Sequence, residues 1–178
     1  MGRAKETAGF ILLYHASTSN LIIHIEFTYT TLLREKGGGV LEGMPGIKTY
    51  TNSVELGIPY REYRPDKGES WCDLMQRAKL FLKEIASNYI FTAEEESKEG
   101  TMKVLGVTHG GFIMEFLNVY RESKGMEMLE MNVCSNTAIY VFHIECLNCK
   151  GVCKDPKCTK ELNVEVLISN DSKHLIKI

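Results

Sequence analysis

The apolar positions of this chain recur at different spacings, and each spacing predicts a different kind of element. Apolar residues three and four positions apart predict a helix over residues 3–14. The same spacing predicts a second helix after Ser70, because Ser70 is a favourable N-cap residue and Asp73 stands three positions later. The apolar face of this second helix comprises Trp71, Leu74, Met75, Ala78, Leu82 and Ile85.

Apolar runs in the middle and near the end of the chain predict strands. Residues 102–108 form a short apolar run, which predicts a buried strand, and a helix is predicted to follow over residues 110–120. Residues 136–145 and 163–169 are rich in β-forming residues and flank a cysteine-containing loop. These two runs predict an antiparallel hairpin.

The remaining segments predict irregular structure. Residues 20–29 alternate loosely and predict an extended segment, and residues 30–46 lead into a glycine-rich loop. Residues 49–67 contain two prolines, one glycine and one asparagine, so we predict a loop there. Residues 94–100 carry clustered like charges and predict a solvated connection.

The order of these elements predicts an α/β fold. A strand between two helices is typical of a mostly parallel sheet with helices on both faces, which makes three layers, and the terminal hairpin adds an antiparallel pair. The chain has 178 residues, of which 44% are hydrophobic, so it can bury one core but hardly two. We therefore expect residues 1–178 to form one domain.

Charge and cysteine content narrow the classes of partner. With 21 Lys and Arg against 23 Asp and Glu, the chain has no global field that would attract nucleic acid or an anionic membrane. No apolar run approaches the roughly 18 residues of a membrane span. Six cysteines without a recognisable signal peptide favour reduced thiols, so we expect a cytoplasmic protein.

The candidate chemistry begins at His109, which follows the predicted strand and precedes the predicted helix. Ligands of open α/β sheets collect beyond the carboxyl ends of strands, where helix N-termini present N–H groups to anions. Gly110 would let its backbone N–H approach a phosphate closely. On the residues alone, His109 is equally well explained as a structural histidine.

Four further motifs appear in a fixed order, and together they resemble the histidine phosphatase superfamily. Residues 3–8 resemble the Arg-Ala-x-Glu-Thr-Ala helix start of that family, and residues 33–43 resemble its Leu-Arg-Glu loop. Residues 68–70 are similar to its Gly-Glu-Ser segment, and residues 108–110 to its second histidine motif. The tail after Asn170 looks like that of TIGAR-type fructose-2,6-bisphosphatases.

The resemblance implies a phosphoglycerate mutase-like fold and a phosphomonoesterase activity on a small phosphate ester, with no cofactor required for catalysis. It implies that His109 and Glu35 are catalytic, Glu35 being the proton donor, and that Arg3, Gly110 and Glu69 contribute to the phosphate site. Each residue also has a simpler interpretation. Arg3 could be an exposed helix residue, Glu35 could offset neighbouring charges, and Glu69 could complement a helix dipole.

The sequence departs from the family pattern because it contains no Arg-His-Gly, the segment that carries the nucleophilic histidine on the first strand of the family sheet. The expectation is therefore an incomplete, N-terminally truncated domain with little activity of its own, since losing a nucleophile costs about a millionfold in turnover. The alternative is a non-catalytic phosphate-binding protein. The sequence leaves the substrate ester and the oligomeric state open.

Four cysteines cluster in a predicted hairpin insertion at residues 146–158. Their thiolates could hold a structural zinc ion, but their spacing departs from two paired Cys-x2-Cys knuckles. Uncoordinated reduced thiols are an equally good interpretation, and a zinc-stabilised interaction module is a further alternative function. The four residues are Cys146, Cys149, Cys153 and Cys158.

Overall fold

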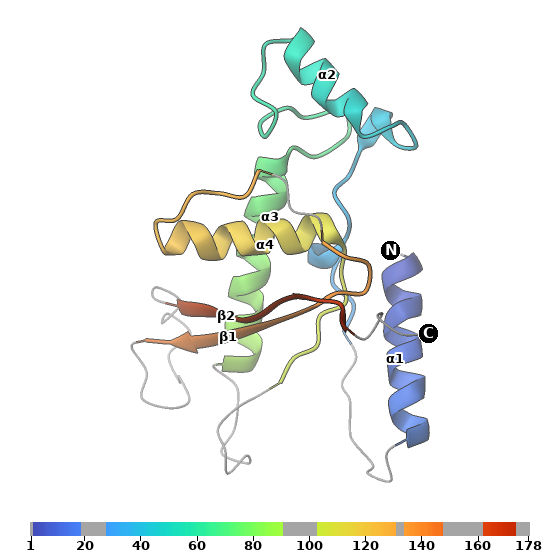
Figure 1. The fold of residues 1–178 in the computed structure, drawn as a ribbon, viewed down its shortest axis with the longest axis vertical. Helices are drawn as coiled ribbons and strands as arrows, with labels where there is room; N and C mark the ends of the chain where they lie inside the picture. Colours follow the sequence, from blue (N-terminus) through green and yellow to red (C-terminus); the bar gives the residue numbers. More distant parts are fainter. Residues whose placement is uncertain (1, 19–27, 91–102, 131–133, 148–161, 174–178) are drawn as a thin grey trace.

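A computed structural model describes residues 2–18, 28–90, 103–130, 134–147 and 162–173 (Figure 1). The predicted extended segment 20–29, the charged segment 94–100 and most of the cysteine-rich segment 146–158 lie wholly or largely outside these ranges. Four α-helices and two strands are described: α1 (Gly2–Thr18), α2 (Ile47–Glu55), α3 (Trp71–Ile85), α4 (Gly110–Ser123), β1 (Ile139–Cys146) and β2 (Leu162–Asp171). A short π-helical turn, Ala86–Ile90, continues α3.

Helix α3 begins where the sequence predicts, at a capping box. The hydroxyl of Ser70 accepts the N–H of Asp73 at 3.1 Å, and the carboxylate of Asp73 accepts the N–H of Ser70 at 2.8 Å. Two N–H groups that would lack partners at a helix start are thereby satisfied. The predicted start of α3 is confirmed, as are the helices over residues 3–14 and 110–120, which α1 and α4 contain.

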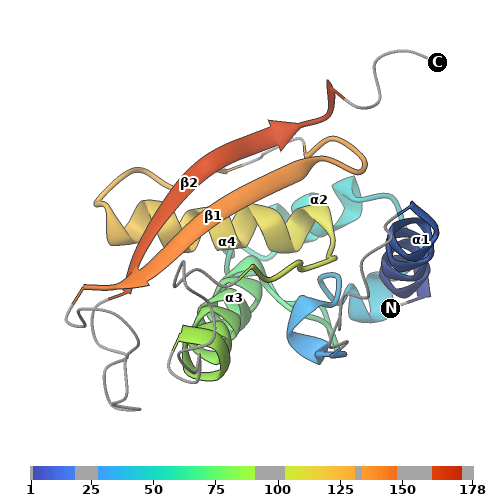
Figure 2. The ribbon, with the colours of Figure 1, turned by 90° about the horizontal axis from the view of Figure 1, so that it is seen from below.

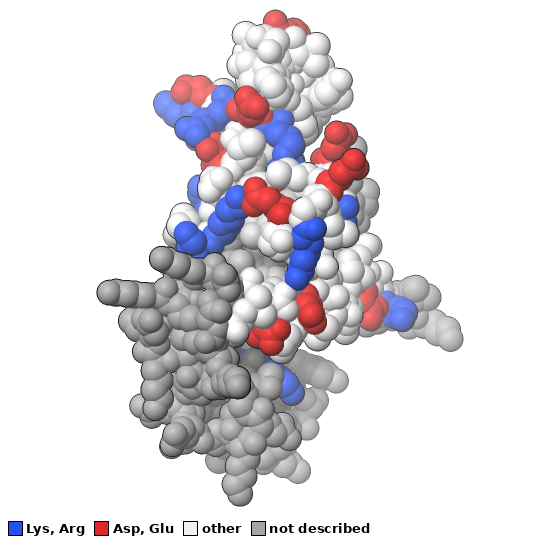
Figure 3. All heavy atoms as spheres, turned by 90° about the vertical axis from the view of Figure 1, so that its left-hand side faces the viewer, with Lys and Arg blue, Asp and Glu red and all other residues white. Residues whose placement is uncertain are grey.

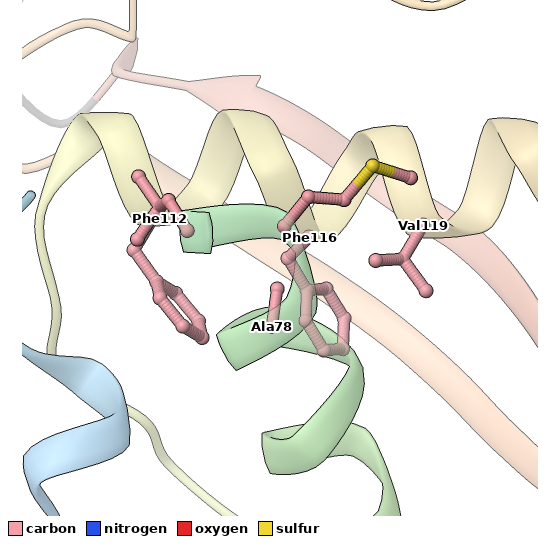
Figure 4. Packing of buried hydrophobic residues seen from close by; sticks show 6 residues of the cluster. Ala78, Phe112, Phe116 and Val119 are labelled. Carbon is pink, nitrogen blue, oxygen red and sulfur yellow. The ribbon is translucent and has the colours of Figure 1, made fainter. Parts of the chain in front are cut away.

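The best-packed part of the core lies where α3 crosses α4 (Figure 4). Phe112 and Phe116 project from successive turns of α4 toward α3, where Ala78 is fully buried and small enough to let the helices approach. The rings of Phe81 and Phe112 meet edge to face with centroids 5.6 Å apart. This interlocking fixes α4, and with it the residue that precedes α4, relative to α3.

The hairpin of β1 and β2 lies along α4 (Figure 2). The two strands pair antiparallel, with His143 opposite Glu165 and Ile144 opposite Val164, so the predicted hairpin is confirmed. Phe142 joins it to the core, because its ring meets that of Phe116 with centroids 4.8 Å apart. This two-stranded antiparallel sheet is the only sheet among the described residues, and no parallel pairing occurs within them.

The predicted buried strand at 102–108 is wrong for the part that the structure describes. Residues 103–109 belong to neither a helix nor a strand, and Val104 and Leu105 are 46% and 73% exposed. A strand exists only where a neighbouring backbone satisfies its N–H and C=O groups, and an apolar run cannot supply that neighbour. Thr108 instead attaches this segment to the loop before α2, because its hydroxyl donates to the carbonyl of Leu33 at 2.8 Å.

The predicted loop at 49–67 is also wrong in part, because α2 occupies Ile47–Glu55. Its polar residues, which usually interrupt helices, donate to carbonyls of the preceding turn: Thr51 to Lys48 at 3.1 Å and Ser53 to Tyr50 at 2.7 Å. Gly57, whose φ of +65° suits glycine, follows the last turn. The prolines at 59 and 65 act only beyond this point.

Candidate active site

An open pocket of about 610 Å³ lies between the first turn of α1, the loop that precedes α2, and the N-terminus of α4. Residues far apart in the sequence meet in this pocket, because the three segments come from the beginning, the first third and the middle of the chain. Three residues singled out from the sequence, Arg3, Glu35 and His109, line it. The full lining comprises Gly2, Arg3, Glu6, Arg34, Glu35, Lys36, Gly37, Glu42 and His109.

His109 is the N-cap residue of α4, with an extended backbone at φ −117° and ψ 155°. Its Nδ1 lies 3.3 Å from Oε2 of Glu35, and its side chain is 13% exposed. Its Nε2 is buried and has no hydrogen-bond partner among the described residues. A buried polar atom without a partner is costly in a finished core, so this nitrogen lacks the hydrogen bond that its burial calls for.

Glu35 lies against the first turn of α4 and also reaches the pocket. Its Oε1 accepts the N–H of Lys36 at 3.1 Å, while its side chain is 50% exposed. A Cβ atom at Gly111 would lie 3.1 Å from the same Oε1. The second glycine of the Gly110-Gly111 pair therefore leaves room for this carboxylate.

The charges around the pocket are mixed but include three cations. Arg3, Arg34 and Lys36 line it together with the carboxylates of Glu6, Glu35 and Glu42. Lys36 lies over the ring of Trp71, with Nζ 5.4 Å from the ring centroid. Burial lowers the pKa of Lys36, although nearby carboxylates, that of Glu69 above all, oppose the shift.

Glu69 does not line the pocket but lies behind Arg34. Its carboxylate is 15% exposed, pairs with the guanidinium groups of Arg34 and Arg77, and accepts the N–H of Gly37 at 2.9 Å. Burial raises the pKa of Glu69, but the Gly37 N–H and the two guanidinium groups lower it by more. The pKa of Glu69 therefore lies below its ordinary value.

Gly110 does not line the pocket either, although it directly follows His109. A Cβ atom there would lie 3.2 Å from the Cβ of Cys134, so glycine permits close packing at this helix start. The structure thus separates the five predicted site residues into two sets. Arg3, Glu35 and His109 share the pocket, whereas Glu69 and Gly110 support its walls.

Arg77 is the site residue that the sequence analysis missed. It is 8% exposed on α3 and donates to the carbonyls of Leu32 and Arg34, both at 2.7 Å, and of Glu35 at 3.3 Å. The signal in the sequence is an arginine adjacent to Ala78 on the predicted apolar face of α3. A buried arginine needs partners, and these carbonyls and Glu69 supply them.

The proposed zinc ligands lie outside what can be described. Residues 149, 153 and 158 are not among the described residues, and of Cys146 only the backbone is described. Among the side chains that the structure describes, no three His, Cys, Asp or Glu residues gather as a metal site would need. The structural zinc ion thus stays a prediction. Cys72 and Cys134, which are described, are free thiols.

The described surface agrees with the small net charge. On the face shown in Figure 3, Lys and Arg side chains are interspersed with Asp and Glu. None of the described helices combines the length and apolar character that a membrane crossing requires. The cations of the pocket are therefore part of a described surface on which both signs of charge occur.

The helices, the hairpin and a pocket of mixed charge with an imidazole–carboxylate pair define an α/β protein with a candidate active site. Comparison with models of protein families identifies the family of the chain. The family model described as "Histidine phosphatase superfamily (branch 1)" matches residues 1–151, and the chain belongs to this superfamily. Members have an α/β fold, and membership suggests a phosphatase-type activity. No curated protein matches the chain significantly.

Proposed function

We propose that the pocket binds the phosphoryl group of a phosphate monoester, with Arg3 and His109 contacting its oxygens and Glu35 acting as the acid and base of hydrolysis. The observation that carries this proposal is the meeting of all three residues in one pocket, with the buried Nε2 of His109 unpartnered. An arginine and an imidazole can stabilise the charge that spreads over the phosphoryl oxygens during transfer.

The proposed reaction proceeds through a phosphohistidine in a form of the protein that includes an Arg-His-Gly segment. A histidine nitrogen of that segment attacks phosphorus, the bond to the leaving oxygen breaks, and Glu35 gives its proton to that oxygen. Water then attacks the phosphohistidine, Glu35 takes the proton, and inorganic phosphate leaves. We expect the 178 residues alone to have little activity, because their sequence contains no Arg-His-Gly.

The same segment would complete the sheet. We propose that its strand pairs with residues 103–108, giving the three-layer, mostly parallel sheet that the resemblance implies. The exposure of Val104 and Leu105 supports this proposal, since a strand that lacks its neighbour leaves apolar side chains in water.

As substrate we propose a sugar phosphate with more than one phosphoryl group, of which fructose-2,6-bisphosphate is the leading candidate. Two observations support this choice. The tail after Asn170 resembles TIGAR-type enzymes. The pocket also offers three cationic side chains, Arg3, Arg34 and Lys36, which could contact oxygens of separate phosphoryl groups beside the carboxylates of Glu6, Glu35 and Glu42.

A phosphatase assay on two versions of the protein tests this function. The first is the 178-residue chain, and the second carries an Arg-His-Gly strand fused before residue 1. We expect release of inorganic phosphate from fructose-2,6-bisphosphate only by the second version, and a loss of roughly a hundredfold or more on Glu35→Gln. Equal activity of the two versions would overturn the assignment of the nucleophile to the added segment.

A second candidate function is phosphate binding without catalysis. It is favoured by the presence of Arg3 and His109 in a pocket of a chain whose sequence lacks Arg-His-Gly. Calorimetric titration of the 178-residue chain with a fructose phosphate should then show binding without turnover. A folded sample that does not bind the sugar phosphate would reject this candidate.

A further inference from the structure

Beneath the pocket, the carboxylate of Glu69 pairs with two arginines, one buried and one half-exposed. Arg77 and Glu69 are both largely buried, with 9% and 15% of their side chains exposed, whereas the Arg34 side chain is 39% exposed and lines the pocket. Glu69 accepts from Arg34 through Oε1 and from Gly37 through Oε2. Both ends of the loop segment that carries Glu35 are therefore tied to this single side chain.

The charges of the three residues do not cancel. Arg34 and Arg77 supply two positive charges and Glu69 one negative charge, so one positive charge remains. Arg77 directs its other donors to carbonyls of Leu32 and Arg34 inside the protein. Since Arg34 alone of the three lines the pocket, the remaining charge is presented to the pocket there.

We propose that Arg34 is an anion-binding residue of the pocket and that Glu69 and Arg77 are positioning residues that hold its guanidinium group toward the ligand. The inference rests on the proposed function, because it assigns further residues to the same phosphate pocket. A guanidinium group can pair with a carboxylate along one edge and keep donors for a second anion on another. In this arrangement Glu69 places a negative charge near the pocket, which opposes anion binding, but it also fixes the direction of the Arg34 side chain.

Substitution of Glu69 separates positioning from simple electrostatics, because the two predict opposite signs. Glu69→Gln removes a negative charge near the pocket, so Coulomb attraction alone would strengthen phosphate binding. Yet glutamine has only one acceptor oxygen, and its NH2 group would face a donor whose hydrogen bond the carboxylate now accepts. Arg34 or the Gly37 N–H then loses its partner, and positioning predicts weaker binding.

The experiment is a calorimetric titration of the 178-residue chain with inorganic phosphate, for the wild type and three variants. We expect Arg34→Gln to weaken binding about ten- to a hundredfold, the range for loss of a charge-assisted hydrogen bond. Glu69→Gln should weaken binding by a smaller factor. Arg34→Lys, which keeps the charge but not the planar fork, should lie between Arg34→Gln and the wild type.

Two matched controls remove an arginine that lies outside the pocket. Arg64→Gln breaks the exposed ion pair with Asp73 at the start of the same helix α3. Arg61→Met breaks the ion pair with the fully buried Glu115 and should cost stability. Both should bind phosphate as the wild type does. Thermal unfolding of every variant identifies any that fails to fold, and Arg34→Gln, at a half-exposed position, then carries the test alone.

The outcomes separate this inference from the proposed function. If the folded wild type does not bind phosphate, the proposed function fails and the inference fails with it. If the wild type binds and Arg3→Gln weakens binding while Arg34→Gln does not, the proposed function stands and the inference is wrong. Tighter binding by folded Glu69→Gln would overturn the positioning role.

Discussion

Two guanidinium–carboxylate pairs, each with one buried member, join neighbouring segments to α3 and α4, and they differ in what surrounds them. Arg77 and Glu69 lie below the pocket, where they hold the loop of Glu35 and contact the half-exposed Arg34. Arg61 pairs with Glu115 at 2.6 Å, and Glu115 is completely buried on α4. Asn118 donates to the carboxylate of Glu115 and exchanges hydrogen bonds with the backbone of Leu129.

The comparison teaches that the same ionic chemistry can serve binding in one place and stability in another. The pair of Arg61 and Glu115 connects the segment after α2 to α4, and neither residue lines the pocket. Glu69, paired with Arg77, also pairs with Arg34, which lines the pocket, and we propose that this contact holds Arg34 toward an anion. The degree of burial of a pair does not distinguish the two roles. The exposure of the residue that the pair contacts does, because Arg34 beside Glu69 is half-exposed whereas Asn118 beside Glu115 is buried.

The largest effect should come from breaking the pair of Arg61 and Glu115, whose carboxylate is fully buried. Glu115→Gln leaves the Arg61 guanidinium partly buried without a counter-charge, so we expect the free energy of unfolding to fall by about 3–5 kcal/mol. Urea denaturation measures this loss. Phosphate affinity measured on the folded protein should not change, and a parallel loss of affinity would contradict the division of roles.

A smaller loss of stability, together with a loss of binding, should follow Arg77→Met. The carbonyls of Leu32, Arg34 and Glu35 lose a donor, but their loop can regain water, so we expect about 2–3 kcal/mol. Phosphate binding should weaken about tenfold because the loop is no longer fixed. Unchanged phosphate affinity in the folded variant would place Arg77 with Arg61 as a purely stabilising residue.

The pH dependence should distinguish Glu69 from its neutral replacement. The pKa of Glu69 lies below its ordinary value of 4.5, so its ionisation stabilises the folded protein above that pH. As the pH falls below about 4.5 and passes through the lowered pKa, this contribution is lost. The difference in unfolding free energy between wild type and Glu69→Gln should therefore be full near neutrality and shrink in acid. A difference independent of pH would show that the charge of Glu69 does not matter.

The smallest effect should come from the exposed ion pair of Arg64 and Asp73. The Arg64 side chain is 62% exposed, and such pairs contribute less than about 1 kcal/mol because solvent screens them. Thermal unfolding of Arg64→Gln should therefore resemble that of the wild type. A large loss would mean that Arg64 supports Asp73 in the capping box of α3.

The elements that the sequence predicted correctly are those whose signals are local. The capping box of Ser70 and Asp73 and the apolar spacing that follows it are complete within a few residues, so the start of α3 could be located. The prediction of a strand at 102–108 was wrong for the described residues, because an apolar run does not show whether a partner backbone lies beside it. Helix α2 was missed because its polar residues bond within the helix, which composition does not reveal.

The candidate site was predictable to the extent that ordered motifs carried it. Those motifs singled out Arg3, Glu35 and His109, which the structure places around one pocket, while their catalytic roles stay predictions. The contacts of Glu69 and Arg77 with the loop of Glu35 could not be inferred. They depend on which carbonyls and guanidinium groups lie near these two side chains in the folded protein. Sequence patterns thus indicated the pocket lining better than the layer that supports it.

The most direct test of the phosphate pocket is a nuclear magnetic resonance titration of the 178-residue chain, labelled with 15N at histidine, with inorganic phosphate. His143, which is exposed on β1, serves as the internal reference. We predict that phosphate shifts the Nε2 signal of His109 well beyond that of His143, and that Arg3→Gln greatly reduces the shift. A folded chain in which the two histidines respond alike would contradict a phosphate site at His109.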